Sequence, residues 1–121
     1  MSVPFRRAVE ARDLQAMEAA LHPDVRFRSP AVFKPYEGRE QVMVLLGHVI
    51  EVFEDFRYTE ELSGDAVHGL VFEARAGEKT LQGWDFLRLD AEGLVTELVV
   101  MIRPLSGLIA VAEAMGARLA P

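Results

Sequence analysis

One carboxylate lies where the pattern of a strand calls for an apolar residue. Alternate residues of the segment LQGWDFLRLD share one face of a predicted strand: Leu81, Gly83, Asp85, Leu87 and Leu89. A polar group in an apolar wall costs roughly 1–3 kcal/mol unless it is hydrogen-bonded. Burial also raises the pKa of a carboxyl group, because the charged form loses water. Two interpretations remain open: Asp85 is a general acid or hydrogen-bond donor to a ligand carbonyl, or it is a structural carboxylate bonded by a neighbouring side chain.

Two histidines are candidates for a second acid–base group. His68 lies near the start of a predicted strand and is either a base beside Asp85 or a partly exposed side chain. His48 lies at the edge of the apolar stripe of a long predicted helix, where it either lines a site or faces solvent. The histidines show no metal-ligand spacing, and the chain has no cysteine and no glycine-rich phosphate loop. We therefore predict no metal site and no cofactor.

Helices at both ends of the chain and a run of strands must position these residues. The patterns predict helices over 3–12, from Asp13 to the segment HPD at 22–24, over 39–53 and over 105–119, and strands over 25–29, 56–62, 67–76, 79–89 and 94–103. Residues 30–38 are predicted to form a loop, because they contain prolines and a glycine. The fold class is therefore α+β, with helices packed on one face of a curved antiparallel sheet. The length fits a single domain over residues 1–121.

Hairpin geometry places apolar residues around Asp85. A two-residue turn at 77–78 puts Leu70 opposite Asp85, and a four-residue loop at 90–93 puts Leu98 opposite Asp85. A slip by one residue would reverse the face. We expect an apolar wall around Asp85, with His68 on the diagonal, made of Leu70, Phe72, Leu87, Leu98 and Val100.

The opposite face of the last strands is also apolar. Its apolar members are Trp84, Phe86, Val99 and Met101. The helices cover one face of the sheet, and nothing in so short a chain is left to cover the other. We therefore expect a homodimer through this outer sheet face.

Charge and hydropathy exclude some partners. The net charge is −6 and there is no basic stripe, so a nucleic-acid partner is not expected. The longest apolar run of a strand, LVVMI at 98–102, is far too short to span a bilayer, and the first residues lack the apolar core of a signal peptide. We expect no membrane association and a cytoplasmic location.

Three segments carry a resemblance to a known superfamily: ARDLQAMEAALHPDVRFRSP, YEGREQV and GWDFLRLDAEGLVTELVVMIRP. From residue 3 to about 105 the chain resembles the nuclear transport factor 2-like superfamily. It is similar to SnoaL-like polyketide cyclases, ketosteroid isomerases and limonene epoxide hydrolases. The resemblance implies a cone-shaped sheet wrapped by the N-terminal helices and one long helix, with a C-terminal helix. It also implies an apolar cavity at the open end, and dimers through the sheet.

The resemblance carries over only some of the functional residues. Asp85 matches the protonated aspartate of the ketosteroid isomerases, which implies a hydrogen-bond donor to an oxyanion. The general-base aspartate of those enzymes falls on Ser29 and their helical tyrosine falls near Phe5, so steroid isomerisation by that mechanism is not predicted. The final-strand aspartate of the epoxide hydrolases falls on Val100, so their triad is broken. The cyclases use acid–base residues near the position of Asp85, so that comparison stays open.

Four further residues are candidates for binding a ligand in the implied cavity. Tyr58 belongs to a core-like strand face, with its hydroxyl group reaching the cavity. Phe33 and Tyr36 lie in the loop at the expected mouth, where Tyr36 is alternatively a packed loop anchor. Ser29 is a hydrogen bonder at the end of a strand.

Two classes of function remain open. The first is a small enzyme, an acid–base isomerase, cyclase or hydrolase acting on a mostly apolar small molecule. The second is a binding module or dimeric assembly domain without chemistry. The sequence alone does not name the ligand, nor does it tell whether the C-terminal helix caps the cavity or swaps onto a partner.

Overall fold

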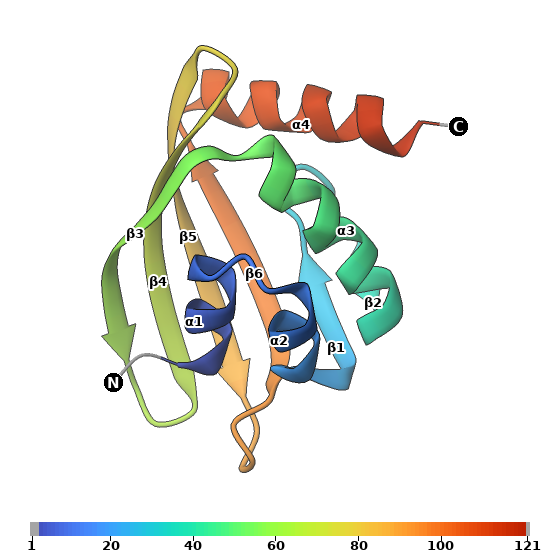
Figure 1. Cartoon of the computed structure of the whole chain (residues 1–121), viewed down its shortest axis with the longest axis vertical. Helices are drawn as coiled ribbons and strands as arrows, with labels where there is room; N and C mark the ends of the chain where they lie inside the picture. The colour runs from blue at the N-terminus through green and yellow to red at the C-terminus, as the bar shows by residue number, and fades with distance from the viewer. Residues whose placement is uncertain (1–2, 121) are drawn as a thin grey trace.

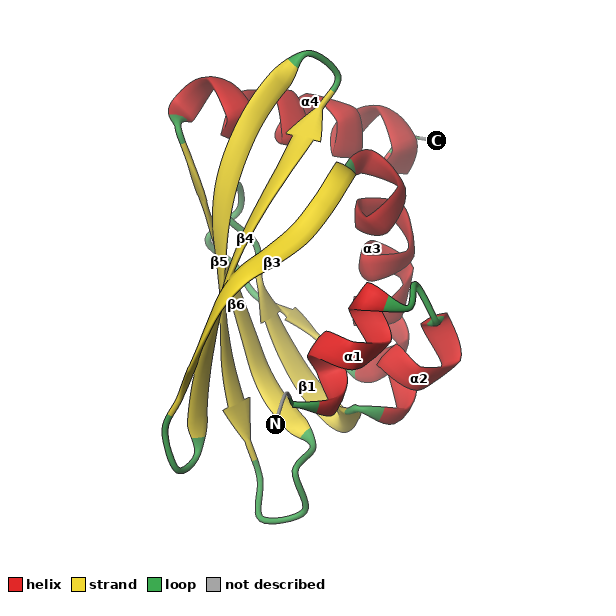
Figure 2. Ribbon diagram, turned by 60° about the vertical axis from the view of Figure 1, so that its left-hand side comes forward, coloured by secondary structure: helices red, strands yellow, loops and turns green. Residues whose placement is uncertain are grey.

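The computed structural model describes residues 3–120 and has a curved, unclosed sheet with helices packed on one side of it (Figures 1 and 2). In chain order the elements are α1 (Pro4–Glu10), α2 (Leu14–Ala19), β1 (Leu21–Arg28), β2 (Tyr36–Glu37), α3 (Arg39–Val52), β3 (Glu54–Ser63), β4 (Val67–Ala76), β5 (Lys79–Leu89), β6 (Val95–Arg103) and α4 (Leu105–Leu119). The predicted α+β class is confirmed.

The sheet has six strands in the order β2-β1-β6-β5-β4-β3. Strands β3 to β6 form the predicted antiparallel meander, and β1 runs parallel to β6. Figure 2 shows the sheet bending around the helices, with α1, α2 and α3 facing its middle and α4 crossing one end.

Most predicted elements occur close to their expected bounds. Asp13 caps α2, because its carboxylate accepts a hydrogen bond from the Ala16 amide at 3.1 Å. The second helix ends earlier than expected, at Ala19, and the segment HPD belongs to β1 instead of stopping the helix. The short strand β2 was not predicted; its two residues pair with β1 within the expected loop.

The register of the first hairpin is confirmed, and that of the second differs by two residues. Leu70 pairs with Asp85, as expected from the turn at 77–78. Val100, instead of Leu98, is the β6 partner of Asp85. The loop between β5 and β6 includes Leu94, whose backbone carbonyl and amide groups form hydrogen bonds with Asp90. In addition, the register shifts between Arg88 and Leu89. A slip of two residues keeps every side chain on its face, so the expected inner face is retained.

Two glycines allow close approaches that shape the interior. A Cβ atom added to Gly83 would lie 2.0 Å from the ring of Phe72, so the bare backbone lets this ring lie flat across β5. A Cβ atom added to Gly107 would lie 2.8 Å from the Cβ of Leu81, so this glycine lets the start of α4 pack onto β5. Both contacts set the position of elements that surround Asp85.

Over residues 3–120, no helix combines the length and the apolar character needed to cross a bilayer.

Candidate functional site

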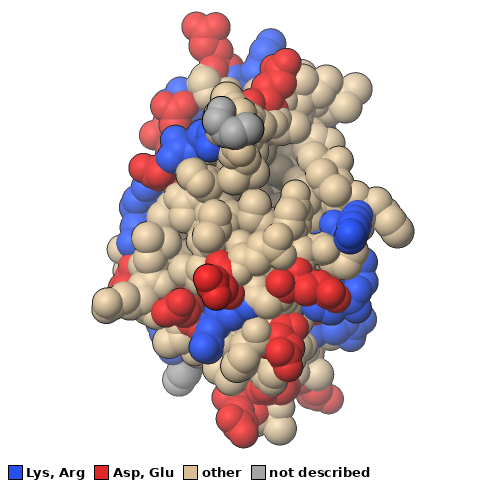
Figure 3. Space-filling view, turned by 90° about the vertical axis from the view of Figure 1, so that its right-hand side faces the viewer, with Lys and Arg blue, Asp and Glu red and all other residues tan. Residues whose placement is uncertain are grey.

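A pocket of about 590 Å³ lies between the inner face of the sheet and the helices. Its wall includes Phe5 of α1, Leu46 of α3, Phe72 of β4 and Met115 of α4. The space-filling view in Figure 3 shows a hollow bordered mainly by uncharged atoms. The lining is predominantly apolar, which is typical of sites for small organic molecules.

Asp85 is the buried carboxyl group of this pocket. It is only 7% exposed and lies between Leu70 and Val100 in the sheet. The Tyr58 hydroxyl donates a hydrogen bond to Asp85 Oδ2 at 3.2 Å, and no other residue of the described chain donates to this carboxyl group in the structure. One oxygen of Asp85 is therefore left without a protein partner on the pocket wall.

The burial of Asp85 changes its proton affinity. Loss of water on burial raises the pKa of Asp85 to about 7, and the hydrogen bond from Tyr58 opposes this rise. The pKa of Tyr58 is itself raised well above its ordinary value, first by burial and then by the charge of Asp85. Near neutral pH, Asp85 therefore exists in both forms, and Tyr58 keeps its proton. The site can present either a carboxylic acid donor or a carboxylate acceptor to a ligand.

Aromatic rings form a rigid wall beside Asp85. The Phe56 ring lies 4.9 Å from the Tyr58 ring in an edge-to-face arrangement, and 4.9 Å from the Phe72 ring. Phe53 stacks on Phe56 with ring centroids 5.6 Å apart. Such contacts stabilise the positions of rings beyond the effect of burial alone. They restrict the Tyr58 hydroxyl group to the vicinity of Asp85.

Arg6 of α1 holds Tyr58 from the other side. Its guanidinium group lies 5.4 Å from the centre of the Tyr58 ring, within the range of a cation–π contact. The same group binds Glu61 of β3 at 3.0 Å and Glu10 at 3.3 Å. The second oxygen of Glu61 is buried and has no partner within the described chain. This cluster joins α1 to β3 directly behind Tyr58.

The C-terminal helix closes one end of the pocket. Leu108, Val111 and Met115 of α4 line it, so within this chain the helix caps the pocket. Near the end of α4, Arg118 donates to His48 Nδ1 of α3 at 3.1 Å and also pairs with Glu51. These contacts tie the free end of α4 to α3.

Seven of the predicted site residues line this pocket: Ser29, Tyr36, Tyr58, Phe72, Asp85, Leu98 and Val100. They come from the loop that follows β1 and from β2, β3, β4, β5 and β6. The sheet therefore brings together residues that are up to about 70 positions apart in the sequence.

Four predicted residues are not part of the pocket lining. Phe33 is 95% exposed in its loop. Leu70 is fully buried in the core beside Asp85. His48 turns toward Arg118 of α4. His68 lies on the diagonal from Asp85, as the register predicted, because it pairs with Leu87 while Leu70 pairs with Asp85; its Nδ1 is buried with no partner in the described chain.

Several lining residues were missed by the sequence analysis. Glu10, Arg12, Asp55 and Arg57 add charges to the pocket lining, and Phe5 and Met115 add apolar surface. The alternation of β3 gave a signal for Tyr58, but Asp55 and Arg57 lie on its polar positions. No local pattern indicates that a charged residue at the end of a helix borders a pocket.

Within residues 3–120, no three histidine, aspartate or glutamate side chains lie close enough together to hold a metal ion.

Solved structures share the fold and, in two cases, much of the sequence. A steroid delta-isomerase from Pseudomonas aeruginosa is 43% identical, with a TM-score of 0.91 over 96% of this chain and 86% of that chain. An uncharacterized protein with a cystatin-like fold from Silicibacter pomeroyi is 34% identical, with a TM-score of 0.90 over 95% of this chain and 82% of that chain. A protein described as a SnoaL-like polyketide cyclase from Shewanella denitrificans is 15% identical, with a TM-score of 0.69 over 92% and 93% of the two chains, which is a likeness of fold alone.

The comparison of sequences identifies the family. No curated protein sequence matches the chain. The family model of the SnoaL-like domain matches residues 4–98, which include the whole of β5 with Asp85 and the first part of β6. The chain belongs to the SnoaL-like domain family.

Proposed function

We propose that the protein is an isomerase or cyclase acting on a mostly apolar carbonyl compound, with Asp85 as the acid. The observation that carries the proposal is the buried Asp85 carboxyl group, bonded by Tyr58 alone within the described chain and facing an apolar pocket. Isomerase and cyclase names among the similar structures support the reaction class. The 43% identity to a steroid delta-isomerase supports a polycyclic or similarly flat apolar substrate.

The proposed role of Asp85 follows from the charge that such reactions develop. Removal of a proton next to a carbonyl group places negative charge on the carbonyl oxygen. A neutral carboxyl group in an apolar wall stabilises this charge by donating a hydrogen bond. Tyr58 strengthens this donor, because its own hydroxyl proton is already directed to the other oxygen of Asp85. The pKa of about 7 keeps a substantial fraction of Asp85 protonated at neutral pH.

The reaction also needs a base. Ser29, which occupies the expected position of the base, is no base at neutral pH. The other carboxylates on the pocket lining are Glu10 and Asp55. Each is held by an arginine, Glu10 by Arg6 and Asp55 by Arg75. We assign the base to one of these two residues.

The test compares wild type with Asp85→Leu and a matched control, Asp65→Asn, in the exposed turn before β4. The probes are a β,γ-unsaturated 3-ketosteroid, whose conversion to the conjugated ketone is followed by absorbance, and a polycyclic phenol that mimics an enolate. We expect Asp85→Leu to lose roughly 10²–10³-fold in kcat, as for loss of an oxyanion donor, while the control retains activity. If neither probe binds to wild type, the proposal is wrong.

A second candidate function is binding without chemistry. It is favoured by the ion pairs of Glu10 and Asp55, which occupy both potential bases. In this case wild type binds the polycyclic phenol and produces no conjugated ketone. Glu10→Gln and Asp55→Asn then leave the affinity for the phenol nearly unchanged.

We also propose a homodimer through the outer sheet face. The described helices lie on the opposite side of the sheet (Figure 2), and Met101 on the outer face is 59% exposed. Trp84 and Phe86 beside it are half-buried and apolar. Sedimentation at micromolar concentration should give the mass of two chains, and Met101→Glu should reduce it to one. A wild-type mass of one chain would contradict this assembly.

A further inference from the structure

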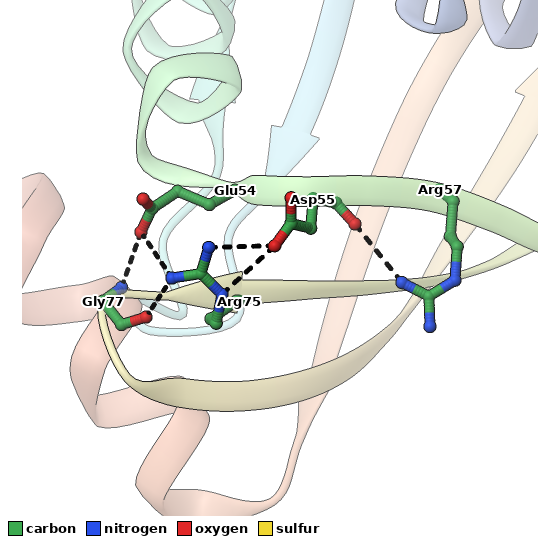
Figure 4. A network of polar contacts seen from close by, with 5 residues as sticks. All are labelled: Glu54, Asp55, Arg57, Arg75 and Gly77. Carbon is green, nitrogen blue, oxygen red and sulfur yellow. Dashed lines mark hydrogen bonds and ion pairs between the residues drawn. The ribbon is translucent and has the colours of Figure 1, made fainter.

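Four charged side chains besides Asp85 line the pocket: Glu10, Arg12, Asp55 and Arg57. Three of them have an ion-pair partner. Glu10 pairs with Arg6 at 3.3 Å, and Arg57 pairs with Glu73. Asp55 pairs with Arg75 at 2.9 Å, as Figure 4 shows together with Glu54 and Gly77. The side chain of Arg12 has neither an ion pair nor a hydrogen bond within residues 3–120. Arg12 is therefore the unpaired charge of the lining.

The backbone of Arg12 is unusual as well. Its φ angle is +54°, in the left-handed region where the side chain of an L-residue meets steric resistance. It ends α1 through two hydrogen bonds, from the Arg12 amide to Val9 and from the Asp13 amide to Ala8. This is the position after a helix where glycine is the usual residue, because glycine lacks the clashing Cβ atom. The chain therefore has an arginine where glycine would make a more stable helix end.

Asp55 also combines a positive φ angle with a place in the pocket lining. Within the described chain, Arg12 and Asp55 are the non-glycine residues with positive φ. Aspartate tolerates this conformation, and the carboxylate of Asp55 is engaged by Arg75. Arg12 has neither explanation. Residues that keep an unfavourable backbone conformation are concentrated at functional sites, so the arginine at this position calls for a role in the pocket.

We propose that the ligand of the pocket carries a carboxylate group that binds Arg12, while its apolar carbonyl body lies against the aromatic wall and Asp85. This inference rests on the proposed function, because it requires a ligand in this pocket, and it adds the class of that ligand: an apolar keto acid. The guanidinium group of arginine matches a carboxylate in charge and in planar geometry. The ligand's charge supplies the partner that Arg12 lacks in the chain.

The surrounding charges select a ligand with one negative charge. Glu61 shares Arg6 with Glu10, and Glu54 shares Arg75 with Asp55, so two carboxylates share one arginine in each of these clusters. A phosphate ester with two negative charges would be repelled by this excess of carboxylates, and a carboxylate would be repelled less. We therefore expect a carboxylate to bind better than a phosphate.

The experiment uses the full chain and matched pairs of probes. The probes are naphthyl ketones with a carboxylate at the end of a chain of two, four or six methylene groups, the primary amide of each, and the phosphonate analogue of each. Calorimetry gives the ratio of affinities of acid and amide for wild type, Arg12→Gln and Arg12→Gly. The control is Arg26→Gln, which removes an arginine of β1 that pairs with Glu37 and does not line the pocket.

Wild type and the control should bind the best acid roughly two- to fivefold more tightly than its amide at low salt, as for an ion pair with the exposed Arg12. Both Arg12 variants should bind acid and amide equally, with the affinity for the amide unchanged. High salt should remove the preference in wild type. The Arg12→Gly variant should also unfold at a higher urea concentration than wild type, because glycine relieves the left-handed backbone.

Other outcomes would overturn the inference. If the amides bind to wild type but the acids show no preference, the assignment of Arg12 is wrong and the proposed pocket function stands. If no probe binds, the pocket function itself fails. A preference that persists in both Arg12 variants, or a phosphonate that binds more tightly than the carboxylate, would also overturn it. A lower urea midpoint for Arg12→Gly would refute the argument that the arginine is kept at a cost in stability.

Discussion

The Asp85→Asn variant tests whether the burial of this carboxyl group is as costly as the structure indicates. Asparagine keeps the shape and the hydrogen-bond acceptor for Tyr58 but cannot ionise. The pKa of Asp85 rises from 3.8 to about 7 on folding. Between these two values the folded state binds a proton that the unfolded state has lost, so stability falls as pH rises. The stabilising effect is complete below about pH 4 and is lost above about pH 7.

The size of the effect follows from the same pKa shift. At 1.36 kcal/mol per pH unit, a rise of about three units corresponds to about 4 kcal/mol of unfolding free energy. This is a large part of the 5–15 kcal/mol that stabilises a typical domain. We expect the unfolding free energy of wild type minus that of Asp85→Asn to fall by about 4 kcal/mol between pH 4 and pH 8. At pH 8 the variant should be the more stable protein.

The assay is urea unfolding of both proteins at several pH values from 4 to 8. The difference in unfolding free energy between the two proteins cancels the contributions of the titrating groups that they share. Glu97 is one such group. Arg28 and Arg88 lower its pKa, so its stabilising effect is lost toward acid pH in both proteins and cancels in the difference. A difference that stays constant with pH would refute the reasoning, because it would mean that Asp85 has the same proton affinity in the folded and unfolded states.

Two further predictions concern the walls of the pocket. Gly83→Ala places a Cβ atom within 2.0 Å of the Phe72 ring, so the ring must move; we expect a loss of about 1–3 kcal/mol in urea unfolding and weaker binding of the polycyclic phenol. The control Gly47→Ala, in open space on α3, should instead be neutral or stabilising by up to about 1 kcal/mol. Arg118→Gln removes the contacts that hold the end of α4 to α3. Because these contacts are exposed, the unfolding free energy should change by less than about 1 kcal/mol, whereas the phenol should dissociate faster in stopped-flow experiments. Equal dissociation rates for wild type, Arg118→Gln and the outer-face control Arg103→Gln would show that α4 does not control access.

The sequence predicted the sheet well, because strands obey a local rule. The period of two in β5 identified the inner face and placed Asp85 on it. The two-residue turn at 77–78 then determined which residue of β4 lies opposite. The loop after β5 was predicted to be one residue too short, and the bulge beside it added a second residue. The period of two made that error harmless for the face, although it exchanged Leu98 for Val100 as the neighbour of Asp85.

The candidate site was predicted only as far as single strands define it. Ser29, Tyr58 and Phe72 were placed on the inner face by alternation, and they lie in the pocket lining. The register placed His68 on the diagonal from Asp85, and the structure keeps it there. The contact of His48 with Arg118 joins two helices that are far apart in the sequence, so no local pattern indicates it.

The amino-acid sequence by itself determined the fold class, the inner face of the sheet and the presence of a carboxyl group on that face, because each depends on periodicity and turn length within short segments. Only the tertiary structure decided that Tyr58 bonds Asp85, that α4 caps the pocket and that Arg12 borders it. These contacts join segments far apart in the chain. Their geometry is set by how the helices pack on the curved sheet, and that packing depends on the whole interior at once.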